Sequence, residues 1–274
     1  MPKPKYHIGY KFESNNGSVF TLIDKDTKKD TYTLVSDLHG SEVVLNRRCV
    51  ISGQFTDYGL PTVYGKGVVG WGKHKVSVEG VHTVNYCVWK GMLSRCYDEK
   101  HRRRLKYTQG EVIGDFTNFH KFSDWFYSRD NVKFYKSHDL CLDSDLLKPS
   151  EYAVYSKESC CLLPANVNLG IRLNNLANRN KELPLGVNFW KNNQDSSTTY
   201  CVKARQGGSN NEKTFYTRDI KEGANIYVKE KQKYINNLVD ENYRIMCEDS
   251  IEACRNFWSK ERLKLSGLYD YVEE

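Results

Sequence analysis

Hydrophobic and polar positions alternate through the first part of the chain. Between residues 8 and 70, short β-branched runs are separated by Asp, Lys and Gly turns: SVFTLIDKD, DTYTLVSD and SEVVLNRRCVISG. Alternation with period two between turn residues is typical of strands. The polar turn DKDTKKD joins the first two runs and predicts a β-hairpin. We expect a small β-rich unit over residues 1–80, ending in the Gly-rich stretch GLPTVYGKGVVGWG.

The period changes after residue 82. Large apolar residues then recur at steps of three and four, which is one face of a helix: Tyr86, Trp89, Leu93, Cys96 and Tyr97. A second aromatic series repeats at steps of three and predicts another helix: Phe116, Phe119, Phe122 and Trp125. Both faces are more typical of a protein core than of a ligand site.

The stretch after residue 140 reads as a hairpin followed by a helix. LCLDSDLL has the composition of a strand or tight loop, LKPSEY is a turn, and YSKESCCLL becomes apolar after its own turn. PANVNLGIRLNNLANRN predicts a short helix that runs into a polar, Asn-rich linker. We place a boundary near residue 180.

The last part of the chain predicts a sheet and helices. LPLGVNFWKNN, TTYCVKARQGG and EKTFYTRD read as three strands, and apolar residues at helical spacing follow from Ile220 to about Met246. A second short helix, SIEACRNFWSKERLKL, comes next. The expected fold class is therefore α+β, divided into residues 1–80, 81–180 and 181–274, with a three-stranded antiparallel sheet packed on a helix in the last part.

Composition indicates a soluble, reduced protein. Hydrophobic residues are 39% and charged residues 27% of the 274 residues. No apolar run approaches the roughly 20 residues of a membrane span, and MPKPKYHIGYKF lacks the apolar stretch of a signal peptide. Nine cysteines are an odd number with no disulfide-scaffold spacing and no C-x-x-C, so we expect a cytoplasmic protein with core cysteines and no zinc.

The net charge of +7 is unevenly distributed. Basic residues concentrate in one segment, where only Asp98 and Glu99 oppose them: Lys90, Arg95, Lys100, Arg102, Arg103, Arg104 and Lys106. Such a run favours a polyanion such as nucleic acid. Part of it would also complement the dipole at the end of the helix that precedes it. Residues 181–274, by contrast, balance acidic and basic side chains.

Two segments resemble known families. YCVWKGMLSRCYDEK, FTNFHKFSDWF and LDSDLL…YSKESCCLLPANVN together resemble the HNH-endonuclease-like proteins of phages and bacteria. The tail from LPLGVNFWKN through YCVKARQGG and TFYTRD to a Tyr- and Lys-rich helix resembles the Apetala2/ethylene-response-factor DNA-binding domain. Together the resemblances cover roughly residues 82–245. They imply a phage-type, DNA-binding protein in the style of a homing endonuclease, acting in the cytoplasm of a bacterial host.

The HNH resemblance implies a metal-dependent site for hydrolysing DNA. Asp143 and Asp145 stand on the strand that would carry it, and carboxylates can hold Mg²⁺ or Mn²⁺. His138 is the candidate base. The tail resemblance implies DNA contacts by residues of the sheet, and alternation places Lys203 and Arg205 on one face while Val202 and Ala204 face the helix. The full set of expected DNA contacts is Arg95, Arg102, Arg103, Arg104, Lys106, Trp190, Lys203, Arg205 and Arg218.

Departures from the HNH pattern leave an alternative open. Ser159 stands where the family turn has Asn, Lys157 stands where it has Pro, and the strand carries no His. The hairpin would then be kept for its shape, with Asp143 and Asp145 as turn or cap residues. The alternative function is a catalytically inactive scaffold that binds a protein partner, with or without DNA. Such a partner could be a host polymerase, a nuclease or a virion component.

Overall fold

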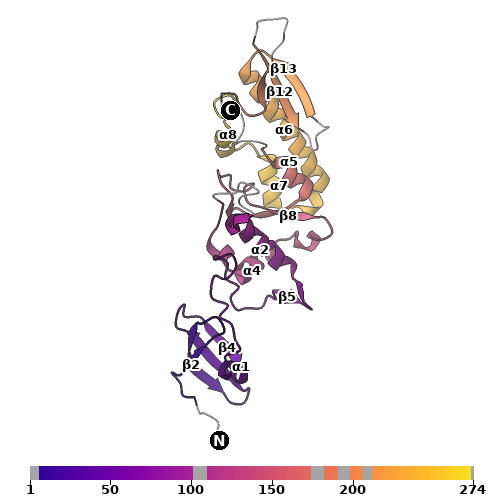
Figure 1. Ribbon diagram of the computed structural model, residues 1–274. Coiled ribbons are helices and arrows are strands. Elements are labelled where there is room, and N and C mark those ends of the chain that lie inside the picture. The colour runs from indigo at the N-terminus through magenta and orange to yellow at the C-terminus, as the bar shows by residue number, and fades with distance from the viewer. Residues whose placement is uncertain (1–5, 101–109, 174–181, 191–197, 206–211, 273–274) are drawn as a thin grey trace. The chain divides into compact units, whose positions relative to one another are not determined.

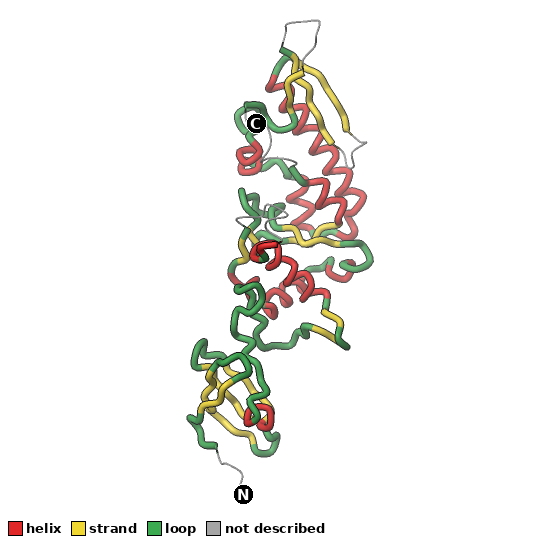
Figure 2. Tube along the Cα trace, in the orientation of Figure 1, coloured by secondary structure: helices red, strands yellow, loops and turns green. Residues whose placement is uncertain are grey.

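The structure confirms the α+β class. The computed structural model describes residues 6–100, 110–173, 182–190, 198–205 and 212–272, in which helices accompany mainly antiparallel sheets (Figures 1 and 2). The chain forms two compact units: Met1–Glu99 with Thr117–Ser123, and Lys100–Phe116 with Asp124–Glu274. In the described ranges, no helix has the length and apolar character to cross a membrane.

An antiparallel sheet in the order β1-β2-β3-β4 opens the first unit. Its strands are β1 (Lys11–Glu13), β2 (Val19–Asp26), β3 (Thr31–Ser36) and β4 (Glu42–Asn46). The predicted hairpin is confirmed, since β2 pairs with β3 across the polar turn. Alternate positions enter a buried cluster: Phe12, Phe20, Leu22, Tyr32, Leu34, Val43, Val50 and Phe55.

One predicted β run is wrong in its second half. SEVVLNRRCVISG is a strand only as far as Asn46, after which α1 (Arg47–Ile51) begins. The Asn46 side chain accepts a hydrogen bond from the backbone N–H of Arg48, and Asn is among the best helix N-cap residues. Because of this cap, the second half of the apolar run forms a helical turn and not the predicted strand.

The rest of the first unit is built around α2 (Val84–Tyr97), which follows the short pair β5 (Ser77–Val78) and β6 (Val81–His82). The predicted helical face is buried, and Trp89 is fully covered. Its ring lies 5.6 Å from the Phe119 ring, centroid to centroid.

The predicted second aromatic helix is divided. Phe116 lies in the 3-10 helix η1 (Gly114–Thr117), and α4 (Phe119–Ser128) starts afterwards. The Asn118 carboxamide accepts from the backbone N–H of His120 and of Lys121, which caps the new helix and explains the break.

The second unit contains the β8–β10 hairpin. β8 (Leu140–Asp143) pairs antiparallel with β10 (Cys161–Pro164), and β7 (Glu111–Val112) pairs with β9 (Val154–Tyr155). The 3-10 helix η2 (Val132–Phe134) precedes β8, and α5 (Ala165–Ile171) follows β10. Cys160 and Cys161 are both fully buried, as predicted for core cysteines.

Three strands form the last sheet, in the order β11-β12-β13. They are β11 (Val187–Trp190), β12 (Thr199–Arg205) and β13 (Glu212–Thr217), and α6 (Ile220–Asn242) packs against them. The predicted sheet-plus-helix module is confirmed. The Asp219 side chain accepts from Lys221 N–H and caps α6, and the 3-10 helix η3 (Tyr243–Ile245) continues from its end.

The predicted final helix is wrong as a single element. It consists of α7 (Glu248–Arg255) and α8 (Lys260–Ser266), because the Ser259 hydroxyl accepts from Arg262 N–H and starts a new helix.

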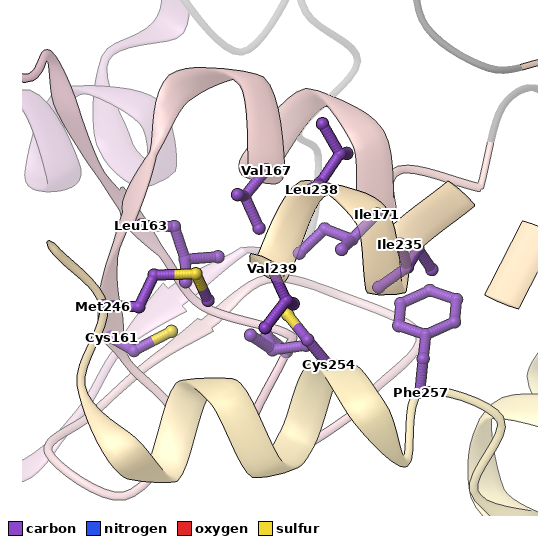
Figure 3. Close-up of a cluster of buried hydrophobic side chains, with 11 residues drawn as sticks. Cys161, Leu163, Val167, Ile171, Ile235, Leu238, Val239, Met246, Cys254 and Phe257 are labelled. Atoms are coloured by element: carbon purple, nitrogen blue, oxygen red, sulfur yellow. The ribbon is translucent and has the colours of Figure 1, made fainter. Parts of the chain in front are cut away.

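One buried cluster joins α6 to the hairpin (Figure 3). Ile235, Leu238 and Val239 of α6 lie among side chains of β10, α5 and α7. The predicted HNH-like core and the predicted tail thus share one helix and one core. The predicted linker near residue 180 lies largely outside the described residues.

Candidate nucleic-acid interface

Asp143 ends β8 with its side chain turned into the protein. It is 8% exposed, and its Oδ1 accepts hydrogen bonds from the backbone N–H of Leu146 at 2.8 Å and of Asp145 at 3.1 Å. A short acidic side chain that bonds the backbone two and three residues ahead forms an Asx turn. Asp143 is therefore a turn residue in this structure.

Burial changes the chemistry of this carboxyl group. It raises the pKa of Asp143 to about 7, and the neighbouring Asp145 carboxylate adds to the rise. The two backbone N–H donors favour the ionised form but do not offset burial. Metal ligands must be deprotonated, so Mg²⁺ would have to displace the proton that burial favours on Asp143.

Of the other two predicted catalytic residues, Asp145 lies beside Asp143, close enough for its carboxylate to raise the pKa of Asp143, and His138 does not join them. Asp145 is exposed on the turn that follows β8. His138 is exposed before the start of β8, with its Nδ1 2.8 Å from the Ser137 hydroxyl and its ring against Phe134. At about 3.3 Å per residue, β8 separates its two ends by about 10 Å. Over the described part of the chain, no group of three or more His, Cys, Asp or Glu gathers where a metal could bind.

Arg262 of α8 donates hydrogen bonds to the backbone of this turn. One guanidinium nitrogen, Nη2, donates to the backbone carbonyls of Asp145 at 2.7 Å and Leu146 at 3.1 Å. The guanidinium lies 4.2 Å from the centre of the Phe257 ring. Burial lowers the pKa of Arg262, while the Asp145 and Asp143 carboxylates act in the opposite direction. No sequence pattern points to this contact, because Arg262 lies more than a hundred residues from the turn.

The β11–β13 sheet has one covered face and one open face. Val202 and Ala204 are fully buried against Ala224 and Tyr227 of α6, as alternation predicts. Lys203 points the other way and is exposed. The side chain of Arg205 lies outside the described residues. We call the side opposite α6 the outer sheet face; by strand register it carries Asn188, Trp190, Thr199, Cys201, Lys203, Glu212, Thr214 and Tyr216.

Two exposed aromatic rings dominate the outer sheet face. Trp190 is 47% exposed and Tyr216 is 56% exposed, and their rings meet edge to face with centroids 5.1 Å apart. Cys201, between them and Lys203 in the register, is buried. The Lys203 ammonium lies 3.1 Å from a Glu212 carboxylate oxygen, in a pair half open to water. Such an exposed pair is worth little and can exchange partners.

The remaining predicted DNA contacts are scattered. Arg95 is partly buried on α2 in the first unit, and Arg218 is exposed directly after β13. Arg102, Arg103, Arg104 and Lys106 lie outside the described residues. Within the second unit, the structure therefore brings Trp190, Lys203 and Tyr216 onto one surface, with Arg218 following the last strand.

Comparison with known proteins gives no relative. No family model, no curated protein and no solved structure matches the chain.

Proposed function

We propose that this protein binds double-stranded DNA through the outer sheet face. The observation that carries the proposal is the pair of exposed aromatic rings, Trp190 and Tyr216, on the same sheet face as Lys203, while Val202 and Ala204 of the opposite face pack on α6. The resemblance of the tail to an Apetala2-type domain supports the same use of the sheet. The HNH resemblance supports a phage protein that acts in the cytoplasm of its bacterial host.

The chemistry of the face suits a DNA groove. Strands can enter the major groove and present alternate side chains to it. Lys203 can leave its exposed pair with Glu212 for a phosphate or a guanine edge. Exposed Trp and Tyr offer large rings that lose little conformational entropy on binding, and both types are enriched where binding energy concentrates. Holding the sheet on α6 keeps these groups preorganised.

The hairpin supports a structural role better than cleavage. Asp143 uses its carboxylate to form the turn, and Arg262 fixes that turn to α8. This arrangement favours a binding protein that keeps an HNH-like scaffold. Metal-dependent hydrolysis at Asp143 and Asp145 is the competing proposal, and the same purified protein can test it.

Fluorescence anisotropy with a pool of labelled random duplexes at 50 mM salt tests the binding proposal. Trp190→Ala/Tyr216→Ala should weaken the affinity about tenfold or more, since interface aromatics commonly contribute over 1 kcal/mol each. The matched control is Phe189→Ala, which removes an equally exposed ring from the opposite face of the same strand. Absence of binding by the wild type would refute the proposal, and equal losses in both variants would refute the assigned face.

Plasmid nicking with Mg²⁺ or Mn²⁺ distinguishes binding from cleavage. A binding protein should leave supercoiled plasmid intact at concentrations that saturate the duplex pool. Nicking that Asp145→Ala abolishes would instead support the competing proposal, because Asp145 is the exposed carboxylate of the pair.

A further inference from the structure

We propose that a basic groove beside α6 binds the phosphate backbone of the same DNA, as a second contact surface separate from the outer sheet face. This inference rests on the proposed function. The groove is an open depression of about 770 Å³ between α6 and the segment that joins α7 to α8. We call it the α6 groove; its lining is Val228, Lys229, Gln232, Lys233, Asn236, Asn237, Arg255, Asn256, Trp258 and Ser259.

The lining is positively charged, and no described lining residue is acidic. Lys229 and Lys233 are exposed and lie one turn apart on α6, where side chains four residues apart are neighbours. Arg255 faces them from the end of α7. Two like charges at this spacing repel each other, so an anion bound between them relieves the repulsion.

Two of the four acidic residues of α6 contact the sheet, whereas Asp240 pairs with Arg255 of the groove lining at 3.5 Å. Glu230 pairs with Lys213 of β13 at 2.9 Å, and Glu222 accepts a hydrogen bond from the Thr217 hydroxyl. Both contacts lie on the side of the helix that faces the sheet. Neither Lys229 nor Lys233 of the groove forms an ion pair with any described residue.

The walls of the groove are held in place. Gln232 Nε2 donates to the Cys254 carbonyl at 3.0 Å, which ties α6 to α7. The Trp258 indole N–H donates to the Val228 carbonyl at 3.1 Å, which ties the following segment to the same helix. These hydrogen bonds fix the backbone that carries the cations, so binding need not order it.

The groove lining also carries amide side chains. Carboxamides of Asn236, Asn237 and Asn256 stand exposed beside the cations and can donate to phosphate oxygens. Within the described residues, Arg255 pairs with the exposed Asp240, at 3.5 Å, and can turn to a phosphate. Cations with amide donors fit a phosphodiester backbone.

Salt dependence of DNA binding by the full chain tests the inference. Each phosphate contact contributes about 0.9 to the slope of log affinity against log salt. Lys229→Ala/Lys233→Ala should therefore make the slope shallower by about 1.8 and weaken binding on the order of 10- to 100-fold near 0.1 M salt. Both side chains are exposed, so the thermal unfolding curve should stay unchanged.

The control separates a local contact from net charge. Lys28→Ala/Lys29→Ala removes the same charge from an exposed turn of the first unit and should leave the slope unchanged. If the wild type binds through Trp190 and Tyr216 while the groove variant keeps the full slope, the groove inference is wrong and the proposed function stands. If both lysine pairs reduce the slope equally, the groove assignment is also wrong. If the wild type binds no duplex, both proposals fall together.

Discussion

Replacing Asp143 by Asn separates a structural role from a catalytic one. The Asn side chain keeps an oxygen that can accept from Asp145 and Leu146 N–H, so the turn is preserved. It removes a buried group whose pKa burial raises from 3.8 to about 7. The folded chain binds a proton at this site more tightly than the unfolded chain does. The stabilisation that this tighter proton binding gives to the folded state is complete below pH 4 and is lost as the pH rises through 7.

The magnitude follows from the size of the pKa shift. A difference of about three units corresponds to about 4 kcal/mol over the whole titration, and to about 2 kcal/mol between pH 5 and pH 7. The wild-type unfolding free energy should fall by that amount over the interval. In Asp143→Asn the fall should disappear, which leaves the variant at least as stable as the wild type at pH 7.

Hydrogen exchange of the β8–β10 amides in a urea series at pH 5, 6 and 7 measures this free energy locally, with rates corrected for intrinsic exchange. The matched control is Asp145→Asn, which should keep most of the pH dependence because burial, not Asp145, is the largest cause of the shift. Parallel pH dependences in the wild type and Asp143→Asn would refute the reasoning. A variant that folds normally but loses metal-dependent nicking would return Asp143 to a catalytic role.

Three further substitutions test other contacts in the second unit. Burial lowers the pKa of Lys231 from 10.5 to about 8, so wild-type stability should rise by about 1.4 kcal/mol per pH unit between those values, and Lys231→Met should lose this rise in urea titrations. Gly186→Ala should lower the melting temperature strongly, because φ is +83° and the new Cβ would meet the Tyr227 ring. Arg129→Ala should cost about 1–3 kcal/mol in urea unfolding, because it breaks a half-buried 2.6 Å pair with Asp249.

Much of the fold follows from local patterns in the sequence. Period-two alternation identified the β2–β3 hairpin and the inward Val202 and Ala204, and helical spacing identified α2 and α6. What the patterns missed were the breaks. Asn46 and Ser259 each cap a new helix inside a run that looked continuous, because a single polar side chain can outweigh several residues of apolar periodicity.

The structure of the candidate site depends more on contacts between residues that lie far apart in the sequence. Sequence reasoning left the role of Asp143 open, since the same residue serves a metal site or an Asx turn. The structure shows the Asx turn, and the burial of Asp143 comes from a core built with α6 and α7. Arg262 could not be predicted, because its partners are backbone carbonyls more than a hundred residues away and carry no side-chain signature.

The shared core of the second unit has a consequence for synthesis on the ribosome. The N-terminal sheet closes its core within residues 12–55, so it can fold soon after it emerges. The β8–β10 hairpin must instead wait for residues as far along as Phe257. At the usual rate of translation, that delay is on the order of 5–20 s. During this interval Cys161, Leu163 and Val167 are exposed, which makes the nascent chain a substrate for chaperones at this stage.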